Sequence, residues 1–464
     1  MESITCQTKE RPLGHSEQLL MSQERYLETA LYIGVNIIES RNEIKLYQVT
    51  NAFQQTSKMN FLMHACVKSD INNNTPCFKP ISDQQLEKRD WMRIDEISLD
   101  DEEAWEREIP KFMAEKFDYE NGPLWRVVWA KIENSENKYI LFFICSHTII
   151  DGKSGFNLIC NQIIPLLNGE ISKCNPIYFG KPQEEIFYDF NQQEMKLSNR
   201  PMSFFLRTMG KMFSWKIYLS RLLWGEPKPC LIHHYYQKFV IEQKASQTLI
   251  KICKSRGKSV HSVLMVLYYN AIEKAKVKFR IQSTGSMIFY PVDLRKFESV
   301  YNDPRTMPLG IYINTAQHEM RHSVISDEDD IFEAASEVMT TIPQFNCPKP
   351  TPNNSDIIFV LIEQGVLTAS LADTFPPSFV LSNLGVCDYM NRFDKDGSRD
   401  VVLRNHFFTV ESRIGFMVNL CTFRNKIHVA ISYGSKKAES ECANYFAEMF
   451  KENILKFVDL YHNC

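Results

Sequence analysis

The chain has 464 residues, which is more than one hydrophobic core usually organises, so we expect two domains or lobes. Apolar residues make up 44% of the chain and charged residues 23%, a balance that argues against collagenous, low-complexity and largely disordered chains. The 53 basic and 56 acidic residues give a net charge of -3, so no basic excess points to nucleic acid as a partner.

Cysteine usage and the N-terminal composition predict a cytoplasmic protein. The 13 cysteines are scattered from Cys6 to Cys464 without a CxxC pair, so we expect reduced, buried thiols rather than a zinc ribbon or a thioredoxin-type site. Residues 1–12 are polar and lack the apolar run of a secretory signal. No stretch of about 18 uninterrupted apolar residues occurs, so a membrane-spanning helix is not predicted.

The first part of the chain alternates between apolar, β-branched runs and amphipathic segments. The predicted strands are residues 31–38, 61–67, 123–132 and 139–145, and the predicted helices are residues 46–54, 100–117 and 156–167. A polar turn at residues 133–137 separates the last two of these strands, which predicts that they form a hairpin.

Residues 170–229 differ in composition, because five prolines punctuate them, and we interpret this stretch as a connection between two halves. Strands and helices alternate again beyond it. We therefore divide the chain into a first lobe (1–180), a connecting segment (181–232) and a second lobe (233–464). The second lobe has predicted strands at 239–241, 286–292, 379–381, 407–409, 415–423 and 426–433, and predicted helices at 245–255, 260–274, 327–341 and 438–460.

Residues 141–155 (LFFICSHTIIDGKSG) carry the clearest indication of chemistry. A buried strand leads into Ser146 and His147, and a histidine at a strand end is well placed for proton transfer. Asp151 can fix the following loop through a buried ion pair, and Gly152 permits a sharp turn before the next helix. The plainer alternative is a core histidine beside a turn-forming Asp-Gly pair. We predict that His147 is the catalytic residue.

His147-Thr-Ile-Ile-Asp151-Gly152 resembles the HHxxxDG signature of the chloramphenicol acetyltransferase and condensation-domain superfamily. Ser146 stands where that signature has its first histidine. Four other segments also resemble members of this superfamily. They are residues 11–14 (RPLG, similar to the opening of stand-alone alcohol acetyltransferases), 122–127 (GPLWRV), 291–295 (PVDLR) and 382–385 (SNLG, similar to the crossover segment near the tunnel).

The resemblance implies an α/β fold with mixed sheets, in which two chloramphenicol-acetyltransferase-like lobes form a V with a tunnel at their interface. A segment of the second half crosses onto the sheet of the first. An acyl thioester enters the tunnel from one face and the acceptor from the other, and they meet at His147. The resemblance also implies a monomer that holds no metal and no bound cofactor and uses acyl-CoA as co-substrate.

The resemblance further implies a role for each site residue. His147 takes the proton of the acceptor as it attacks the thioester carbonyl. Asp151 pairs with Arg295 and, with Gly152, holds the loop rather than touching the substrate. Ser382 and Asn383 are the candidate donors to the oxyanion in the tunnel.

The leading expectation is an O-acyltransferase that uses acyl-CoA and an apolar or amphipathic alcohol. Two features argue against peptide synthesis, namely the serine at position 146 and a length that leaves no room for a carrier domain. Transfer to an amine, including condensation-type amide formation from a carrier-bound thioester, remains an alternative. A non-catalytic module that binds acyl chains or a carrier protein is a further alternative.

Residues 195–225 are the one anomaly in the charge distribution. They contain six basic residues and no acidic residue, and apolar side chains are interleaved with the basic ones. Such a basic amphipathic stretch can lie on an anionic membrane surface, which makes peripheral membrane contact a further expectation. The plainer alternative is a connecting helix that packs its apolar face against the lobes.

Overall fold

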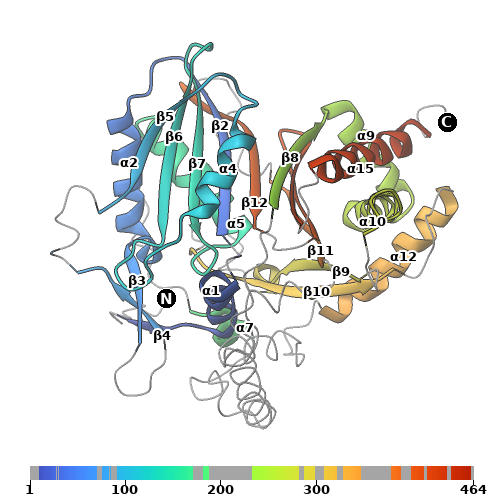
Figure 1. The fold of residues 1–464 in the computed structure, drawn as a ribbon, viewed down its shortest axis with the longest axis horizontal. Coiled ribbons are helices and arrows are strands. Elements are labelled where there is room, and N and C mark those ends of the chain that lie inside the picture. Colours follow the sequence, from blue (N-terminus) through green and yellow to red (C-terminus); the bar gives the residue numbers. More distant parts are fainter. Residues whose placement is uncertain are drawn as a thin grey trace, which may run out of the picture.

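The structure is a computed structural model with two sheet-based lobes (Figure 1). It describes residues 10–27, 29, 31–69, 76–82, 84, 91–170, 181–187, 233–281, 287–297, 308–320, 328–345, 378–387, 399–411, 415–435 and 440–460.

A five-stranded sheet organises the first lobe, in the order β12-β2-β7-β6-β5. The pair β5–β6 is parallel, and the other neighbours are antiparallel. The predicted hairpin is confirmed, because β6 and β7 pair from Trp125–Cys145 to Lys131–Tyr139. The strands are β2 (Leu31–Ser40), β5 (Ile94–Leu99), β6 (Trp125–Ile132), β7 (Lys138–Ser146) and β12 (Val401–Val410).

Helices cover both faces of this sheet, which explains why β2 and β7 are apolar along almost their whole length (Figure 1). Helix α4 (Trp105–Ala114) packs on one face through Trp105 and Ile109. Helix α2 (Leu46–Met59) packs on the other face, together with α5 (Gly152–Leu158) and α6 (Ile164–Leu167). A π-helical turn at Ile159–Ile163 separates α5 from α6, where the sequence predicts one continuous helix.

A small sheet, of which only β3 overlaps a predicted strand, and two helices that were not predicted complete this part of the structure. The sheet has the order β1-β4-β3, with β1 (Arg11–Pro12), β4 (Pro76–Pro80) and β3 (Ala65–Ser69). The prediction of a strand at residues 61–67 is partly wrong, because Phe61–His64 form a 3₁₀ turn and β3 begins only at Ala65. The two helices are α1 (His15–Leu27) and α7 (Gln183–Phe187).

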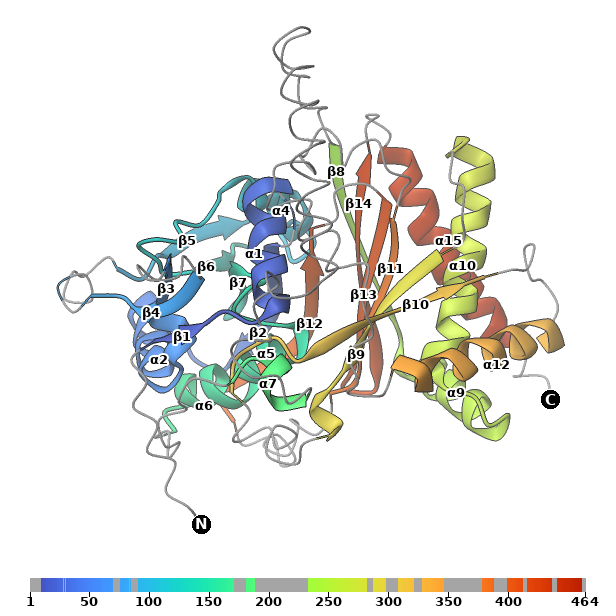
Figure 2. The same ribbon diagram turned by 90° about the horizontal axis from the view of Figure 1, so that it is seen from below.

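A six-stranded sheet organises the second lobe, in the order β10-β9-β11-β13-β14-β8. Its helices lie together on one side of the sheet (Figure 2). The strands are β8 (His233–Ile241), β9 (Met287–Asp293), β10 (Ile313–Glu319), β11 (Ser378–Val386), β13 (Gly415–Phe423) and β14 (Lys426–Ser435). The helices are α9 (Gln243–Ser255), α10 (Val260–Phe279), α12 (Glu328–Phe345) and α15 (Ser440–Leu460).

The other face of this sheet turns toward the first lobe. Alternation along β13 separates the two sides, because Phe416 and Val418 join the core under the helices whereas Cys421 joins the core of the first lobe. Ala430 of β14 and Tyr236 of β8 pack in the core under α4. The interface between the lobes is therefore built from the inner face of the six-stranded sheet.

Strand β12 connects the two halves, because it belongs to the second half of the chain but completes the sheet of the first. It pairs antiparallel with β2, from Val401–Ser40 to Val410–Tyr32. Residues 401–410 of the range 233–464 therefore lie in the first sheet. The expectation that residues 382–385 form the crossover is wrong, since they lie in β11 of the six-stranded sheet.

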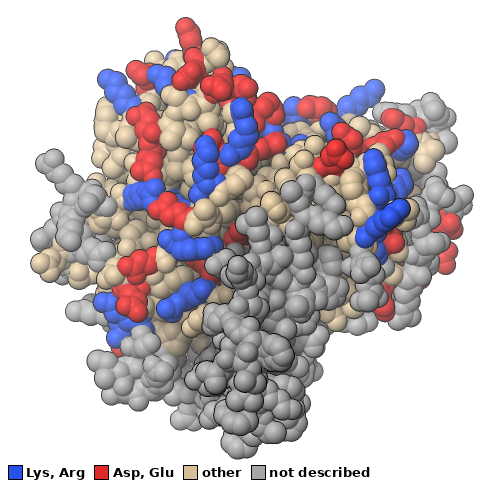
Figure 3. Space-filling view, in the orientation of Figure 1, with Lys and Arg blue, Asp and Glu red and all other residues tan. Residues whose placement is uncertain are grey.

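Three expectations about composition can be compared with the described residues. All eight cysteines whose placement is described are buried and free of disulfide bonds. None of the described helices is long and apolar enough to cross a lipid bilayer. On the face of the molecule that Figure 3 shows, basic and acidic side chains of the described residues lie next to each other on both lobes. The basic stretch at residues 195–225 lies outside the described residues.

Candidate active site

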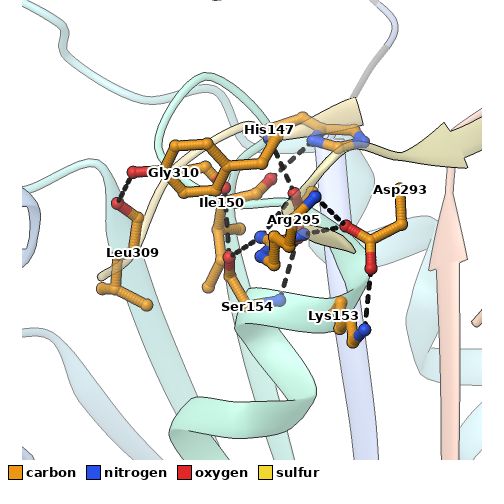
Figure 4. A network of polar contacts seen from close by, with 10 residues as sticks. His147, Ile150, Lys153, Ser154, Asp293, Arg295, Leu309 and Gly310 are labelled. Carbon is orange, nitrogen blue, oxygen red and sulfur yellow. Dashed lines mark hydrogen bonds and ion pairs between the residues drawn. The ribbon is translucent and has the colours of Figure 1, made fainter. Parts of the chain in front are cut away.

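The segment that links β7 to α5 carries the predicted motif (Figure 4). The strand ends at Ser146, and His147 follows in the turn. Asp151 begins the helix, because its carboxylate accepts a hydrogen bond from the Ser154 N–H at 2.9 Å. A buried strand and a capped helix thus fix both ends of a short loop.

The imidazole of His147 is held in one orientation and one tautomer. Its Nδ1 lies 2.6 Å from the carbonyl oxygen of Ile150. A carbonyl can only accept a hydrogen bond, so Nδ1 carries the proton and Nε2 keeps its lone pair. Burial lowers the pKa of His147 below its ordinary value of 6.5, although the charge of Asp151 opposes this shift. The ring is therefore neutral at pH 7, and Nε2 can accept a proton.

Asp151 and Arg295 meet across the lobes, as predicted. Arg295 Nη2 donates to both carboxylate oxygens of Asp151, at 2.9 and 2.8 Å. The carboxylate also accepts from the backbone N–H groups of Ser154 and Tyr312, each at 2.9 Å. These contacts occupy the roughly four lone-pair sites of a carboxylate. Asp151 therefore has no acceptor site left for a substrate, and the pair is fully buried.

The ion pair extends into a network of residues that the sequence-based reasoning missed (Figure 4). Arg295 Nη1 donates to Asp293 at 3.0 Å, and Asp293 accepts from Lys153 Nζ at 2.7 Å. Arg295 Nη2 also donates to Ser154 Oγ at 2.6 Å, and this hydroxyl donates to the Gly310 carbonyl at 3.1 Å. Lys153 and Ser154 adjoin the motif and Asp293 adjoins Arg295, so proximity in sequence was the only signal for them.

The reason for a glycine at position 152 differs from the one predicted. Gly152 is not among the described residues with a positive φ, so it does not provide a left-handed turn. A Cβ at this position would lie 3.0 Å from Leu384 Cδ2 and 3.1 Å from Phe408 Cε2. Side chains from β11 and β12 therefore lie close against the start of α5, and a larger residue at position 152 would have to displace them.

Gly155 stands in a tighter contact, and this leads to a prediction about stability. A Cβ at Gly155 would lie 2.6 Å from the hydroxyl of Tyr32, a buried residue that stacks on Phe408. We expect Gly155→Ala to lower the free energy of unfolding, measured by urea denaturation, by about 1–3 kcal/mol because the core there is already full. Tyr32→Phe removes the nearest atom and should recover part of this loss. If Gly155→Ala lowered the free energy of unfolding equally in the wild type and in the Tyr32→Phe protein, this explanation would be wrong.

Both predicted tunnel donors lie in β11. Ser382 is buried and lies on the side of the strand that turns toward the first lobe, as does Leu384. Asn383 uses its side-chain oxygen locally, since Oδ1 accepts from the Gly385 N–H at 2.8 Å. Among the described residues, no hydrogen bond joins either side chain to His147.

Comparison with known proteins supports the fold. Neither a protein family nor a curated protein matches the sequence. Among solved structures, the TRI3 trichothecene 15-O-acetyltransferase from Fusarium sporotrichioides is similar with a TM-score of 0.61 and 14% identity, over 97% of this chain and 95% of that chain. The first condensation domain of the calcium-dependent antibiotic synthetase gives a TM-score of 0.62 at 11% identity, over 97% and 96% of the two chains.

A third similar structure is the epimerization domain from the third module of tyrocidine synthetase B. Its TM-score is 0.58 at 13% identity, over 97% of this chain and 96% of that chain. The chain therefore has the two-lobed α/β fold of condensation domains and of chloramphenicol-acetyltransferase-like enzymes, as its motif predicts. At these identities, the likeness establishes the fold.

Proposed function

We propose that this protein is an acyltransferase that moves an acyl group from an acyl-CoA thioester to the hydroxyl of an apolar or amphipathic alcohol. The observation that carries the proposal is the geometry of His147. Its Nδ1–H is bonded to the Ile150 carbonyl, so the neutral ring offers Nε2 as a general base in a loop that Asp151 and Arg295 hold.

The reaction follows from that geometry. Nε2 takes the proton of the alcohol as its oxygen attacks the thioester carbonyl carbon, and the carbonyl electron pair moves onto oxygen. The carbon–oxygen bond remains as the tetrahedral oxyanion collapses, and the carbon–sulfur bond breaks. The imidazolium returns its proton to the leaving thiolate. Ser382 and Asn383 remain our candidate donors to the oxyanion.

Two observations favour an alcohol as the acceptor. Position 146 holds a serine instead of the first histidine of the HHxxxDG signature. One protein with the same fold is a trichothecene 15-O-acetyltransferase, whereas others are condensation domains. Transfer to an amine, from CoA or from a carrier-bound thioester, is the alternative that experiment must separate from ester formation.

Release of free thiol tests the proposal. Purified protein is mixed with acetyl-, octanoyl- or palmitoyl-CoA, with and without a panel of alcohols and amines. We expect release that alcohols stimulate, and the acyl-CoA with the highest rate identifies the preferred chain length. Stimulation by amines alone would replace the ester-forming proposal with amide formation. If the folded protein released no thiol with any combination of acyl-CoA and acceptor, that result would count against acyl-CoA as the donor.

The proposed base predicts the pH dependence of the reaction. Only the neutral imidazole accepts a proton, so activity falls as the pH drops through the pKa of His147. Because burial lowers this pKa, we expect the acid limb of kcat/KM that belongs to His147 to lie below pH 6.5. The measurement is kcat/KM for thiol release over a series of buffers. If the acid limb of kcat/KM that belongs to His147 lay above pH 6.5, the ring would not be desolvated in the free enzyme.

We also propose that the basic stretch at residues 195–225 contacts anionic membranes beside the entrance for the acceptor. Its six basic residues and interleaved apolar side chains support this proposal. Co-sedimentation with anionic liposomes at low salt is expected, with little binding to neutral liposomes. Absence of binding to anionic liposomes at low salt would remove the proposal.

A further inference from the structure

A chain of buried polar groups lies directly behind the His147 loop. Tyr119 is its centre, and its hydroxyl lies 2.6 Å from Glu24 Oε2 and 2.6 Å from Ser146 Oγ. The same hydroxyl lies 3.3 Å from Thr148 Oγ1, and Ser146 Oγ accepts from the Thr148 N–H at 3.2 Å. Ser146 and Thr148 are the two residues that flank His147, so the chain ends on both sides of it.

Glu24 is an unusual residue to find in this position. It lies in α1, is only 2% exposed, and has no ion-pair partner among the described residues. Its Oε1 is buried and accepts no hydrogen bond from the described residues. A buried carboxylate that is neither paired with a charge nor fully hydrogen-bonded is costly, and an apolar residue would fill the same space more cheaply. This cost points to a role beyond packing.

The charge state of Glu24 decides the direction of the hydrogen bonds. An ionised carboxylate only accepts, so Tyr119 donates to Glu24 and Ser146 can donate to Tyr119. A protonated Glu24 can instead donate to Tyr119, whose own proton then turns to Ser146 or Thr148. The ionised form therefore fixes the Tyr119 proton on Glu24, whereas the protonated form releases it toward the two residues that flank His147.

The groups around Glu24 leave it able to change charge near neutral pH. Burial raises its pKa to about 7, and the nearby hydroxyl groups of Ser146 and Tyr119 oppose that rise. Lys116 and Arg126 lower it further, although Arg126 directs its Nη2 at the carbonyls of Phe112 and Glu115. The charge of Glu24 also acts on Cys145, and the pKa of that thiol is raised well above its ordinary value by burial and by the carboxylate.

We propose that Glu24 is a positioning residue for His147. In its ionised form it orients Tyr119 and Ser146, and this hydrogen-bonded chain holds the residues on either side of the imidazole. The effect on turnover rests on the proposed acyl transfer, whereas the effect on the reactivity of His147 does not. Glu24 touches neither the ring nor the reacting atoms in this account.

The first test is the pH profile of thiol release by wild type and Glu24→Gln, which keeps the shape of the side chain. In the wild type we expect a second rise in kcat near pH 7, above the limb of His147. In Glu24→Gln this rise should be absent, and kcat above it should be lower by about tenfold with KM little changed. Glu106→Gln is the matched control, because burial also raises the pKa of Glu106 to about 7. Glu106 lies on α4, which packs on the opposite face of the sheet from α5, so this variant should keep the wild-type pH profile.

The second test needs no turnover. Diethyl pyrocarbonate modifies neutral histidine. The rate of modification of His147 is obtained by subtracting the rate measured for His147→Ala from the rate measured for the wild type. We expect this rate to rise several-fold as Glu24 ionises, and Glu24→Gln or Tyr119→Phe to abolish the rise. A wild-type profile in both variants, whose folding is checked by thermal melting, would overturn the inference. A Glu24-dependent rise without any thiol release would support the inference and reject the proposed function instead.

Discussion

His147→Ala is expected to lower the rate of alcohol-stimulated thiol release by a factor of about 10²–10⁴, which is the usual contribution of a positioned general base. The loss should be in kcat, because the ring acts on the acceptor proton rather than on binding of the thioester. The fold should survive. The side chain lies in a short loop, keeps 8% of its surface exposed, and makes one hydrogen bond within that loop.

His64→Ala is the matched control for this prediction. Its Nδ1 also bonds a backbone carbonyl, that of Ser57 at 2.9 Å, and burial likewise lowers its pKa. It precedes β3 and lies outside the β7–α5 loop. The control should keep wild-type turnover, and thermal melting should show that both variants are folded. A folded His147→Ala protein with unchanged thiol release would reject the general base and favour the non-catalytic alternative.

Arg295→Ala and Asp151→Ala are each expected to lower the free energy of unfolding by about 3–5 kcal/mol. Arg295→Ala leaves the buried Asp151 carboxylate without a cationic partner, and Asp151→Ala leaves the buried Arg295 guanidinium with Asp293 as its remaining ion-pair partner. Turnover should fall as well, because Arg295→Ala removes the contact from Arg295 that holds the loop of His147, and Asp151→Ala removes the contact from Tyr312 in addition. Urea denaturation measures the first effect and thiol release the second.

Two comparisons separate a structural role from a chemical one. The double variant Asp151→Ala/Arg295→Ala should lose much less than the sum of the single losses, since no unpaired charge remains. Arg404→Ala breaks an exposed pair with Glu39 at 2.6 Å and should cost less than about 1 kcal/mol. An Asp151→Ala protein with wild-type stability but no turnover would contradict the structural role and place the carboxylate in the chemistry.

The sequence predicts the elements whose patterns are strong. Strands β2, β6 and β7 lie where their apolar runs indicate, because a sheet covered on both faces needs apolar residues throughout. Strands β5 (IDEISL) and β10 (INTAQHE) were missed, since partly exposed strands with polar residues resemble loops. The pairing of β12 with β2 joins residues far apart in sequence, and no local pattern could identify that partner.

The sequence likewise predicts only part of the candidate site. His147, Asp151 and Arg295 were predicted from the motif and its resemblance, and the structure brings Asp151 and Arg295 into contact. Glu24 and Tyr119 were not predicted. They are 95 positions apart in the chain and meet only because α1 and the segment before β6 pack behind the loop. The sequence identifies their partner Ser146 only as a departure from the signature, whereas in the structure its hydroxyl contacts Tyr119.

In the proposed function, His147 is the general base for ester formation from an acyl thioester. The most direct measurement is mass spectrometry of the product formed from an isotope-labelled acyl-CoA and a single apolar alcohol, with wild type beside His147→Ala. We expect the wild type to form a labelled ester in an amount that grows with time and equals the thiol released, and the folded variant to form little ester. Equal amounts of ester from both proteins, or hydrolysis to the free acid alone, would contradict it.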